Sequence, residues 1–583
     1  MRQGESGQLA RTGWADRLAS RLAGLAHAPK GFVRRPEPRT IGSYARGRQL
    51  VSGTFQLAGF LVEGLDRPIW DVSMPDQRFE AELHGCAWLD DLAAVADASA
   101  RERAQSWVFG WIQRFGTGGG RGWAPELTGR RLIRLINHAP FLLGGRDQAD
   151  TAAFFRCLGL HTTYLARRWR AAPEGIAQFE ALTGLICAAQ SLSGMEGHLP
   201  SAAAAMARLC SRQIEPDGAI PTRNPQELME VLTHLTWAEA ALKEAGQAEP
   251  PALRAAIERI APTLRALRHA DGGLARFHGG GRGAEGRLDQ ALASAGGRAV
   301  TAHGLAMGYA RLAAGRTTVI VDAAAPPTGP ASDNAHASTL AMELTSARRP
   351  VIVNCGSGAS YGADWWRAGR ATPLHSTLCI RGLSSSRIES AAGPEGTGRG
   401  VLAEVPDQVW AQVDSDLDGV RLLGGHNGFG PTHGMTHVRE LTLSIDGRHL
   451  KGEDTLGAMT APDRKRYEKV IARLGAEGIR FDVRFHLHPD VDAALDLGGT
   501  AVSMALKSGE IWVFRHDGVG ELSLEPSVYL EKGRLKPRPA RQIVLSATVV
   551  DYACQLGWTL AKAQDTPAAI RDTLRDEDIP KPS

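Results

Sequence analysis

The chain has 583 residues, of which 43% are hydrophobic and 22% are charged, and its formal net charge is +4. These proportions exclude a generally disordered chain. The near balance of 67 basic and 63 acidic residues does not mark a nucleic-acid-binding protein. Seven Cys residues, scattered without paired spacing, exclude a disulfide-built scaffold and are expected to be reduced.

Residues 1–60 are predicted to form a partly helical extension. Four apolar residues recur there at helical spacing and predict a short amphipathic helix: Trp14, Leu18, Leu22 and Leu25. This helix would contact a membrane or, as we favour, dock on its own domain. Arg21 interrupts the apolar stretch, so the core of a secretory signal is missing. No transmembrane run is expected either, and the sequence by itself indicates a cytoplasmic protein.

Residues 61–315 are dominated by helical periodicity, with apolar residues at three- and four-residue spacing in Ala-rich segments. The predicted helices span 84–98, 101–115, 130–143, 149–170, 175–192, 202–213, 225–245, 251–268 and 297–314. Repeated helix pairs over this length favour a helical toroid or solenoid over a simple bundle.

The character of the sequence changes at Gly315. Short segments rich in Val, Ile and Leu, separated by Gly, Asp and Pro turns, predict strands at 317–322, 340–344, 350–354, 376–380, 409–413, 437–445, 479–488, 501–506, 511–516, 522–529 and 541–547. Because only 461–475 has a helical pattern among them, residues 316–564 are predicted to form an antiparallel β-sandwich. The charged, Pro-ended tail at 565–583 is predicted to be flexible.

Three segments near the start of the strand region carry polar side chains that neighbouring strands would bring together. They are 335–340, 350–356 and 366–377, and they contain His336, Asn354, Arg367, Arg370 and His375. Turn histidines that cap strand ends are the structural alternative. His486 and His488 alternate along one strand, where a solvated face is favoured over a zinc pair. The Gly-rich stretch 276–283 lacks the preceding strand of a dinucleotide loop, so no phosphate role is expected there.

These segments resemble the heparinase II/III family of polysaccharide lyases, and within it a bacterial subgroup without a defined substrate. The resemblance covers about residues 60–560 and is carried by His-Ala-Ser-Thr-Leu at 336–340, Val-Asn-Cys-Gly at 353–356, Arg370 with Thr372 and His375, Gly-His-Asn-Gly-Phe at 425–429, Lys-Gly-Glu-Asp at 451–454, Phe-His-Leu-His-Pro at 485–489, Glu-Leu-His at 82–84 with Trp88, and Asp-Gly at 217–218 with Arg-Asn-Pro at 223–225. It implies an α+β multidomain fold, in which an incomplete (α/α) toroid precedes an antiparallel β-sandwich.

The resemblance also implies β-elimination on uronic-acid polysaccharides. That chemistry needs a cation or hydrogen-bond donor to neutralise the uronate carboxylate, a base to take the adjacent proton, and an acid to protonate the leaving oxygen. The implied catalytic residues are His336 or His375 as base or acid, with Arg223 and Asn224. Glu227 stands where the family has its catalytic Tyr.

The substrate contacts implied in the same way are Arg370, Arg367, Gln178, Trp123 and His426. Gln178 lies in the segment where the family has a carboxylate-neutralising Asn or His. Trp123 would stack on a sugar if it lines a toroid cleft, although core packing is the equal alternative. The family's metal site corresponds to His336, Asn354 and His375, but a neutral Asn is a poor zinc ligand. Bound Zn²⁺ or Ca²⁺ is therefore not expected, and no other cofactor is predicted.

Three functions stay open. The chain is a lyase with altered residues, or a glycan-binding or cell-envelope-associated protein that has lost elimination, or a glycosidase that uses Glu227 with a second acid. The first is favoured, with an acidic polysaccharide as the partner. The family is typically periplasmic or associated with the cell envelope, which the missing signal does not match.

Overall fold

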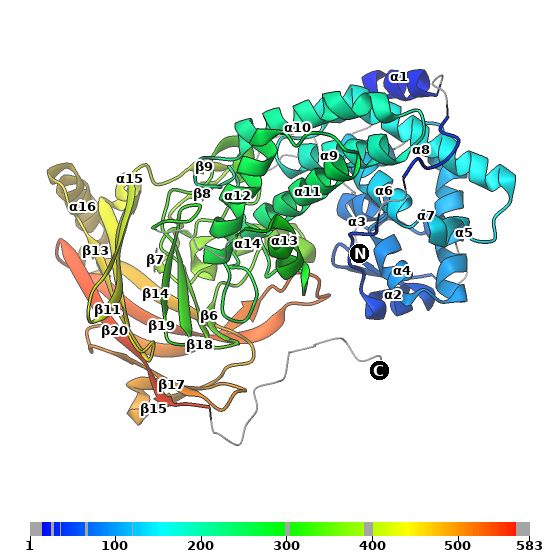
Figure 1. Cartoon of the computed structure of the whole chain (residues 1–583). Helices are drawn as coiled ribbons and strands as arrows, with labels where there is room; N and C mark the ends of the chain where they lie inside the picture. The colour runs from blue at the N-terminus through cyan, green and yellow to red at the C-terminus, as the bar shows by residue number, and fades with distance from the viewer. Residues whose placement is uncertain are drawn as a thin grey trace. The chain divides into compact units, whose positions relative to one another are not determined.

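The computed structural model describes residues 14–24, 28–34, 37–64, 68–118, 121–297, 304–389 and 400–566. The chain divides into two compact units, which Figure 1 shows as a helical part and a strand-rich part. The helical unit comprises residues 1–218, 229–261 and 289–297, and the β unit comprises 219–228, 262–288 and 298–583.

Helices account for almost all regular structure before residue 297. They are α1 (Trp14–Ala23), α2 (Tyr44–Val51), α3 (Gln77–His84), α4 (Trp88–Val95), α5 (Ala98–Phe115), α6 (Pro125–Asn137), α7 (Ala139–Leu143), α8 (Gln148–Arg168), α9 (Ile176–Ser191), α10 (Leu199–Gln213), α11 (Pro225–Glu244), α12 (Pro251–Ala266) and α13 (Arg287–Ala295), with a small hairpin of β1 (Thr54–Leu57) and β2 (Phe60–Glu63). No helix in the described part of the chain is long and apolar enough to cross a membrane.

Helices α6 and α9 approach each other closely because glycines face each other between them. A Cβ placed on Gly184 would lie 2.5 Å from the Cα of Gly129, so neither position tolerates a side chain at this separation. Arg130 on α6 donates two hydrogen bonds to the carboxylate of Glu180 on α9, at 3.0 and 2.8 Å. The pair therefore has both apolar packing and a bidentate ion pair.

The predicted amphipathic helix forms as α1, and it contacts α8. Arg168 on α8 donates to Asp16 at 2.7 Å, and Ala19 and Ala23 are buried. Leu18 and Leu22 remain 48% and 45% exposed, so the helix docks through its small residues rather than through its leucines. Leu25 lies outside the described residues.

The β unit is built from two large antiparallel sheets. The first has the order β10-β11-β12-β13-β20-β17-β16-β15, and the second has the order β18-β19-β14-β6-β5-β4-β3, with β7 also paired to β14. Their strands are β3 (Tyr309–Ala314), β4 (Thr317–Asp322), β5 (Met342–Ser346), β6 (Arg349–Val353), β7 (Leu378–Ile380), β10 (Val409–Ser415), β11 (Gly419–Phe429), β12 (Met435–Ser444), β13 (His449–Gly457), β14 (Ile479–Leu487), β15 (Asp492–Asp496), β16 (Ala501–Ala505), β17 (Ile511–His516), β18 (Glu521–Tyr529), β19 (Arg538–Val549) and β20 (Ala553–Gln564).

Smaller elements complete this unit. They are the short pair β8 (Arg387–Ile388) and β9 (Leu402–Glu404) and the helices α14 (Ala363–Gly369), α15 (Gly430–His433) and α16 (Ala461–Leu474). One apolar core joins the two sheets, since Leu344, Phe485 and Leu545 of the second sheet belong to the same buried cluster as Leu441 and Trp558 of the first. An antiparallel sandwich with alternating buried residues follows from this arrangement.

The structure corrects several boundaries. The helix predicted at 297–314 is wrong, because β3 (Tyr309–Ala314) pairs with β4 and the backbone pairing overrides the helix preference of its Ala residues. The helix predicted at 84–98 forms with shorter bounds, as α4 (Trp88–Val95), because α3 already ends at His84. The solvated face predicted at His486 and His488 is buried instead. Most of the predicted tail, 567–583, lies outside the described residues.

Candidate functional site

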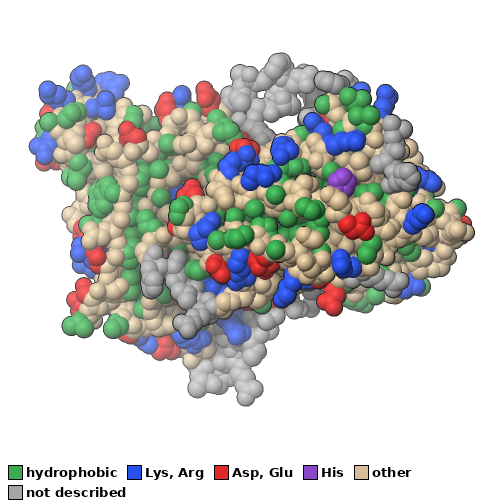
Figure 2. All heavy atoms as spheres, turned by 45° about the horizontal axis from the view of Figure 1, so that its top comes forward, with side chains coloured by type: hydrophobic (Ala, Val, Ile, Leu, Met, Phe, Trp, Pro, Cys, Tyr) green, Lys and Arg blue, Asp and Glu red, His purple; other side chains and the backbone are tan. Residues whose placement is uncertain are grey.

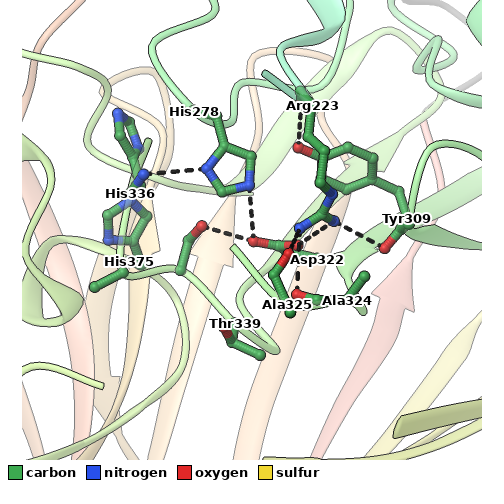
Figure 3. A network of polar contacts seen from close by, with 12 residues as sticks. Arg223, His278, Tyr309, Asp322, Ala324, Ala325, His336, Thr339 and His375 are labelled. Atoms are coloured by element: carbon green, nitrogen blue, oxygen red, sulfur yellow. Dashed lines mark hydrogen bonds and ion pairs between the residues drawn. The ribbon is translucent and has the colours of Figure 1, made fainter. Parts of the chain in front are cut away.

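The candidate site lies in the β unit and is centred on a buried ion pair between Asp322 and Arg223. Asp322 is the last residue of β4, and Arg223 precedes α11 (Figure 3). Arg223 Nη2 donates to Asp322 Oδ1 at 2.6 Å. The other donors of Arg223 bond backbone oxygens of Met307, Gly308, Ala324 and Ala325. Since a guanidinium has five N–H donors, none of them is left for a substrate carboxylate.

Arg223 has a strained backbone that its surroundings hold in place. Its φ is +49°, in the left-handed region that residues with a Cβ seldom adopt. The Tyr309 hydroxyl donates to the Arg223 carbonyl at 2.6 Å, and the guanidinium lies 4.8 Å from the centre of the Tyr309 ring. The local strain is thus offset by contacts that fix the guanidinium on Asp322.

A row of three histidines continues from Asp322. His278 Nε2 lies 3.4 Å from Asp322 Oδ2, and the backbone N–H of His336 donates to His278 Nδ1 at 3.1 Å. His336 Nδ1 and His375 Nε2 are 2.9 Å apart, and His375 Nδ1 lies 2.9 Å from the Ala371 carbonyl oxygen. Figure 3 shows the three rings and Asp322 in this order.

The protonation of the row follows from its backbone contacts. Gly279 N–H donates to His336 Nε2 at 3.0 Å, so this nitrogen carries no proton. His336 then holds its proton on Nδ1 and donates it to His375 Nε2, and His375 donates its own Nδ1 proton to Ala371. By the same reasoning His278 holds its proton on Nε2, facing Asp322. Every ring is neutral, and every ring lone pair has a donor.

Burial determines the electrostatics of this cluster. It lowers the pKa of His375 to about 4 and holds the pKa values of His336 and His278 below their usual value. Burial alone would raise the pKa of Asp322, but Arg223 and His278 outweigh it and hold the pKa below its usual range. Asp322 is therefore ionised at neutral pH, while the three imidazoles are not.

Arg370, predicted to bind a substrate carboxylate, is also fully buried. Its guanidinium donates to the carbonyl oxygens of Ala335 and Ser332, both at 2.7 Å, and to that of Gly400. It also lies 4.7 Å from the Trp366 ring centre. A substrate could reach this group only if the hydrogen bonds that fix the loop before His336 were broken.

The remaining predicted residues lie on several elements of the two units. Asn224 caps α11, since its Oδ1 accepts from the backbone of Gln226 and Glu227. Glu227 is half-buried in the first turn of that helix, and Arg367 on α14 is exposed. These residues belong to the β unit, whereas Gln178 and Trp123 belong to the helical unit.

Neither of the helical-unit residues presents a free binding group. Gln178 Nε2 donates to Ala172 O, and its Oε1 accepts from Arg212 and Gln213. Trp123 is 1% exposed, and its ring packs against His161 and Tyr164 at 4.8 and 5.2 Å. Trp123 is therefore a core residue, which was the alternative to stacking on a sugar.

The predicted metal ligands do not fit a metal ion. His336 and His375 share a direct hydrogen bond, which uses the two nitrogens that face each other. Asn354 Oδ1 accepts from the backbone of Ser376, and its Nδ2 is not a ligand atom. Among the described residues, no three His, Cys, Asp or Glu side chains are grouped to hold a metal.

His426, predicted to touch substrate, belongs to a second buried network between β11, β12 and β13. Its Nε2 lies 3.3 Å from His437 Nδ1, and His437 Nε2 lies 2.8 Å from Asp454 Oδ1. Arg439 makes a bidentate pair with Asp454 at 2.7 and 3.1 Å, and the Trp558 indole donates to the same carboxylate. Gly428 N–H donates to His426 Nδ1, as Gly279 N–H donates to His336 Nε2 in the first row.

Sequence reasoning missed the residues that organise both clusters. Asp322, His278 and Tyr309 were not proposed for the first, nor Asp454 and Arg439 for the second. One signal was present, since Asp322 ends an apolar strand, where a buried charge needs a partner. His278 stands in the Gly-rich stretch considered only for phosphate binding.

Comparison with known proteins agrees with this fold. A family model described as heparinase II/III-like, C-terminal, matches residues 297–559. FtsZ-localized protein C from Caulobacter vibrioides (strain NA1000 / CB15N) is 33% identical over 548 residues, which covers 92% of this chain and 91% of that protein.

Solved lyase structures share the fold at low identity. A crystal structure of heparinase III has a TM-score of 0.64 at 11% identity, covering 94% of this chain and 89% of its own. A mutant of heparan sulfate lyase HepC from Pedobacter heparinus has a TM-score of 0.57 at 14% identity, covering 94% and 88%.

The chain therefore belongs to the heparinase II/III-like family. The predicted family and the predicted fold class, a helical region followed by antiparallel β sheets, are both confirmed. An enzymatic activity does not follow, because a fold carries many functions.

Proposed function

We propose that this chain is an FtsZ-associated protein that uses the heparinase II/III-like fold for binding and does not eliminate uronates at the predicted site. The observation that carries the proposal is the 33% identity to FtsZ-localized protein C, which extends along 92% of this chain. A relationship over this length includes both units, so a shared role for the whole chain is more economical than one for the β unit alone.

The geometry of the His336 cluster supports the second half of the proposal. A general base needs a free lone pair near the substrate proton, and a carboxylate clamp needs free donors. The lone pairs of His336 and His375 already accept hydrogen bonds, and both side chains are buried. Arg223 and Arg370 donate to backbone oxygens. Glu227 at the family's Tyr position supplies no phenol.

Elimination of a uronic-acid polysaccharide is the second candidate. It is favoured by the family model match, since residues 297–559 include His336, His375 and Arg370. Binding of an acidic polysaccharide and a location at the cell envelope belong to this candidate. It requires the imidazole row to open when substrate binds, because the rings have no free lone pair as they stand.

Co-sedimentation tests the association. Purified chain is mixed with FtsZ assembled by GTP, and the pellet is compared with one from FtsZ kept unassembled by GDP. We expect the chain in the pellet with assembled FtsZ and in the supernatant otherwise. Recovery in the supernatant in both cases would contradict the proposal.

An elimination assay separates the two candidates. The ultraviolet absorbance of unsaturated uronate is followed on heparan sulfate, hyaluronan, alginate and bacterial exopolysaccharides. We expect no rise. A rise that is lost in His336→Ala and His375→Ala, and kept in the matched buried control His437→Ala, would establish elimination at the predicted site instead.

A further inference from the structure

Helix α16 presents a row of three cations for which the fold provides no partner. Lys465, Lys469 and Arg473 are spaced by four residues, so they lie along one side of the helix, and all three are exposed. Among the described residues no carboxylate forms an ion pair with any of them. In Figure 2, Lys and Arg side chains gather at the upper left, where Figure 1 places α16. We refer to these three residues as the α16 stripe.

The stripe works against the stability of its own helix. Like charges at this spacing repel each other and destabilise a helix. The local acids do not relieve this repulsion, because Asp463 closes the capping box with Thr460 and Glu468 accepts from the Tyr552 hydroxyl at 2.9 Å. A local cost without a structural gain in the folded chain indicates a role outside it.

The helix is nevertheless firmly attached to the β unit. Tyr467 and Val470 are buried in the core, and Arg466 Nη1 donates to the Gly430 carbonyl at 2.9 Å. The remaining cation, Arg464, lies 5.6 Å from the centre of the Tyr552 ring. The stripe is therefore displayed on a rigid element, which lowers the entropic cost of binding.

Two exposed apolar side chains lie next to α16. Met459 directly precedes the N-cap Thr460 and is 58% exposed, and Tyr552, which donates its hydroxyl to Glu468 of the helix, is 41% exposed. Met and Tyr are enriched in the contact surfaces of proteins, where they add apolar area beside charged groups. The combination suits separated carboxylates with apolar side chains between them, as an acidic polypeptide presents.

We propose that the α16 stripe, with Met459 and Tyr552 beside it, is a docking surface for an acidic segment of a partner polypeptide. On the function proposed above, that segment belongs to FtsZ, and to this extent the inference rests on that function. The attraction is electrostatic, so binding should weaken as salt rises.

Charge reversal tests the surface. The stripe variant is K465E/K469E/R473E, and the matched control is R348E/K451E/K536E, which changes the net charge equally at exposed cations without ion-pair partners elsewhere in the β unit. We expect the stripe variant to lose about tenfold or more in affinity for assembled FtsZ at low salt, and the control to bind like the unchanged chain. Equal urea midpoints would show that both variants are folded.

A second probe separates failure of the surface from failure of the proposed function. The same three proteins are passed over immobilised poly-glutamate and mixed with phosphatidylglycerol vesicles. If the chain ignores FtsZ but binds poly-glutamate through the stripe, the FtsZ association is wrong and the docking surface stands. If the stripe variant binds both polypeptides as well as the unchanged chain does, or if the stripe matters only for vesicles, the inference is overturned.

Discussion

The β unit contains two buried clusters of the same design, and only one of them carries the family's His motifs. In the first, Asp322 holds Arg223, and a row of imidazoles ends at the backbone around His336 and His375. In the second, Asp454 holds Arg439, and a shorter row ends at the backbone around His426. Each has an ionised carboxylate, a buried guanidinium and neutral rings.

Because the two clusters are alike, His336 and His375 can be structural residues even though they stand in the family's motifs. The Asp454 cluster lies between strands of one sheet with 0% exposure for Asp454 and Arg439, so it stabilises the sandwich. The Asp322 cluster has the same pattern of hydrogen bonds and is also buried, although Arg223 is 9% exposed where Arg439 is 0% exposed. A retained His motif therefore does not distinguish catalysis from structure here. What differs is strain, because Arg223 and His278 both have positive φ and no residue named in the Asp454 cluster does.

Removing the carboxylate charge should be most damaging in the second cluster. Asp454→Asn leaves Arg439 buried without its ion-pair partner and weakens the bonds from His437 and Trp558. We expect a loss of about 3–5 kcal/mol in the free energy of unfolding, measured by urea denaturation. A loss below about 1 kcal/mol would mean that this network does not stabilise the sandwich.

The same substitution in the first cluster should cost less. Asp322→Asn also separates a buried ion pair, but Arg223 keeps four backbone acceptors where Arg439 keeps two, the carbonyls of Leu340 and Ser376. We expect a loss of about 2–3 kcal/mol, because charge-assisted bonds to carbonyls retain part of the stabilisation. Asp322→Asn could instead leave the free energy of unfolding unchanged and alter binding to FtsZ or activity on a uronate polymer. The cluster would then be functional rather than structural.

The sequence predicts the fold class and the motif histidines, but not most of the contacts within the two clusters. Alternating and helical patterns predicted the helical and strand regions, and motif residues His336 and His375 were expected to lie together, as they do. The partners of these residues come from segments far away in the sequence. The periodicity of one segment does not reveal which distant residues will contact it. Asp322 and His278 are two such partners, and His278 lies in a loop that has no periodicity at all.

The helix propensity of the Ala residues also led to a wrong prediction at 309–314. Ala310, Ala313 and Ala314 favour a helix, yet pairing of β3 with β4 decided the structure. The roles assigned to Arg223 and Arg370 could not be judged from sequence, because the acceptors that occupy them are backbone oxygens, which any residue supplies.

Acid should destabilise the β unit through its neutral histidines before its carboxylates titrate. His375 has a pKa of about 4 when folded, whereas an unfolded His has a pKa near 6.5, so the unfolded state binds more protons below about pH 6.5. Stability therefore falls as pH falls, by about 2 kcal/mol from this residue between pH 7 and pH 5.

The carboxylates act lower on the scale. The pKa values of Asp322 and Asp454 are held below the usual range, so their contribution is present above about pH 4 and is lost only as pH falls further. Urea midpoints at pH 5, 6 and 7 check this order. His375→Gln should show a smaller slope than the unchanged chain, and an identical slope would contradict the low pKa assigned to His375.

A single hydroxyl gives the smallest effect. Ser338→Ala removes the bond from its Oγ to Asp322 Oδ2, which is 2.7 Å long. We expect a loss of about 1.5 kcal/mol, the lower end for a hydrogen bond to a charged group, because Asp322 keeps Arg223. Ser523→Ala is a suitable control, because its hydroxyl bonds a half-buried surface carboxylate, that of Glu525. Equal midpoints for the two variants would remove Ser338 from the cluster.

Histidine-selective ¹⁵N NMR spectra, assigned with the His336 and His375 variants, test the central claim most directly. We expect His336 and His375 to be neutral, with the proton on Nδ1, and we expect no titration of their signals between pH 5 and pH 7. A signal from either ring that titrates in this range, or a proton on Nε2 of His375, would contradict the closed row and return the motif histidines to candidacy as catalytic groups.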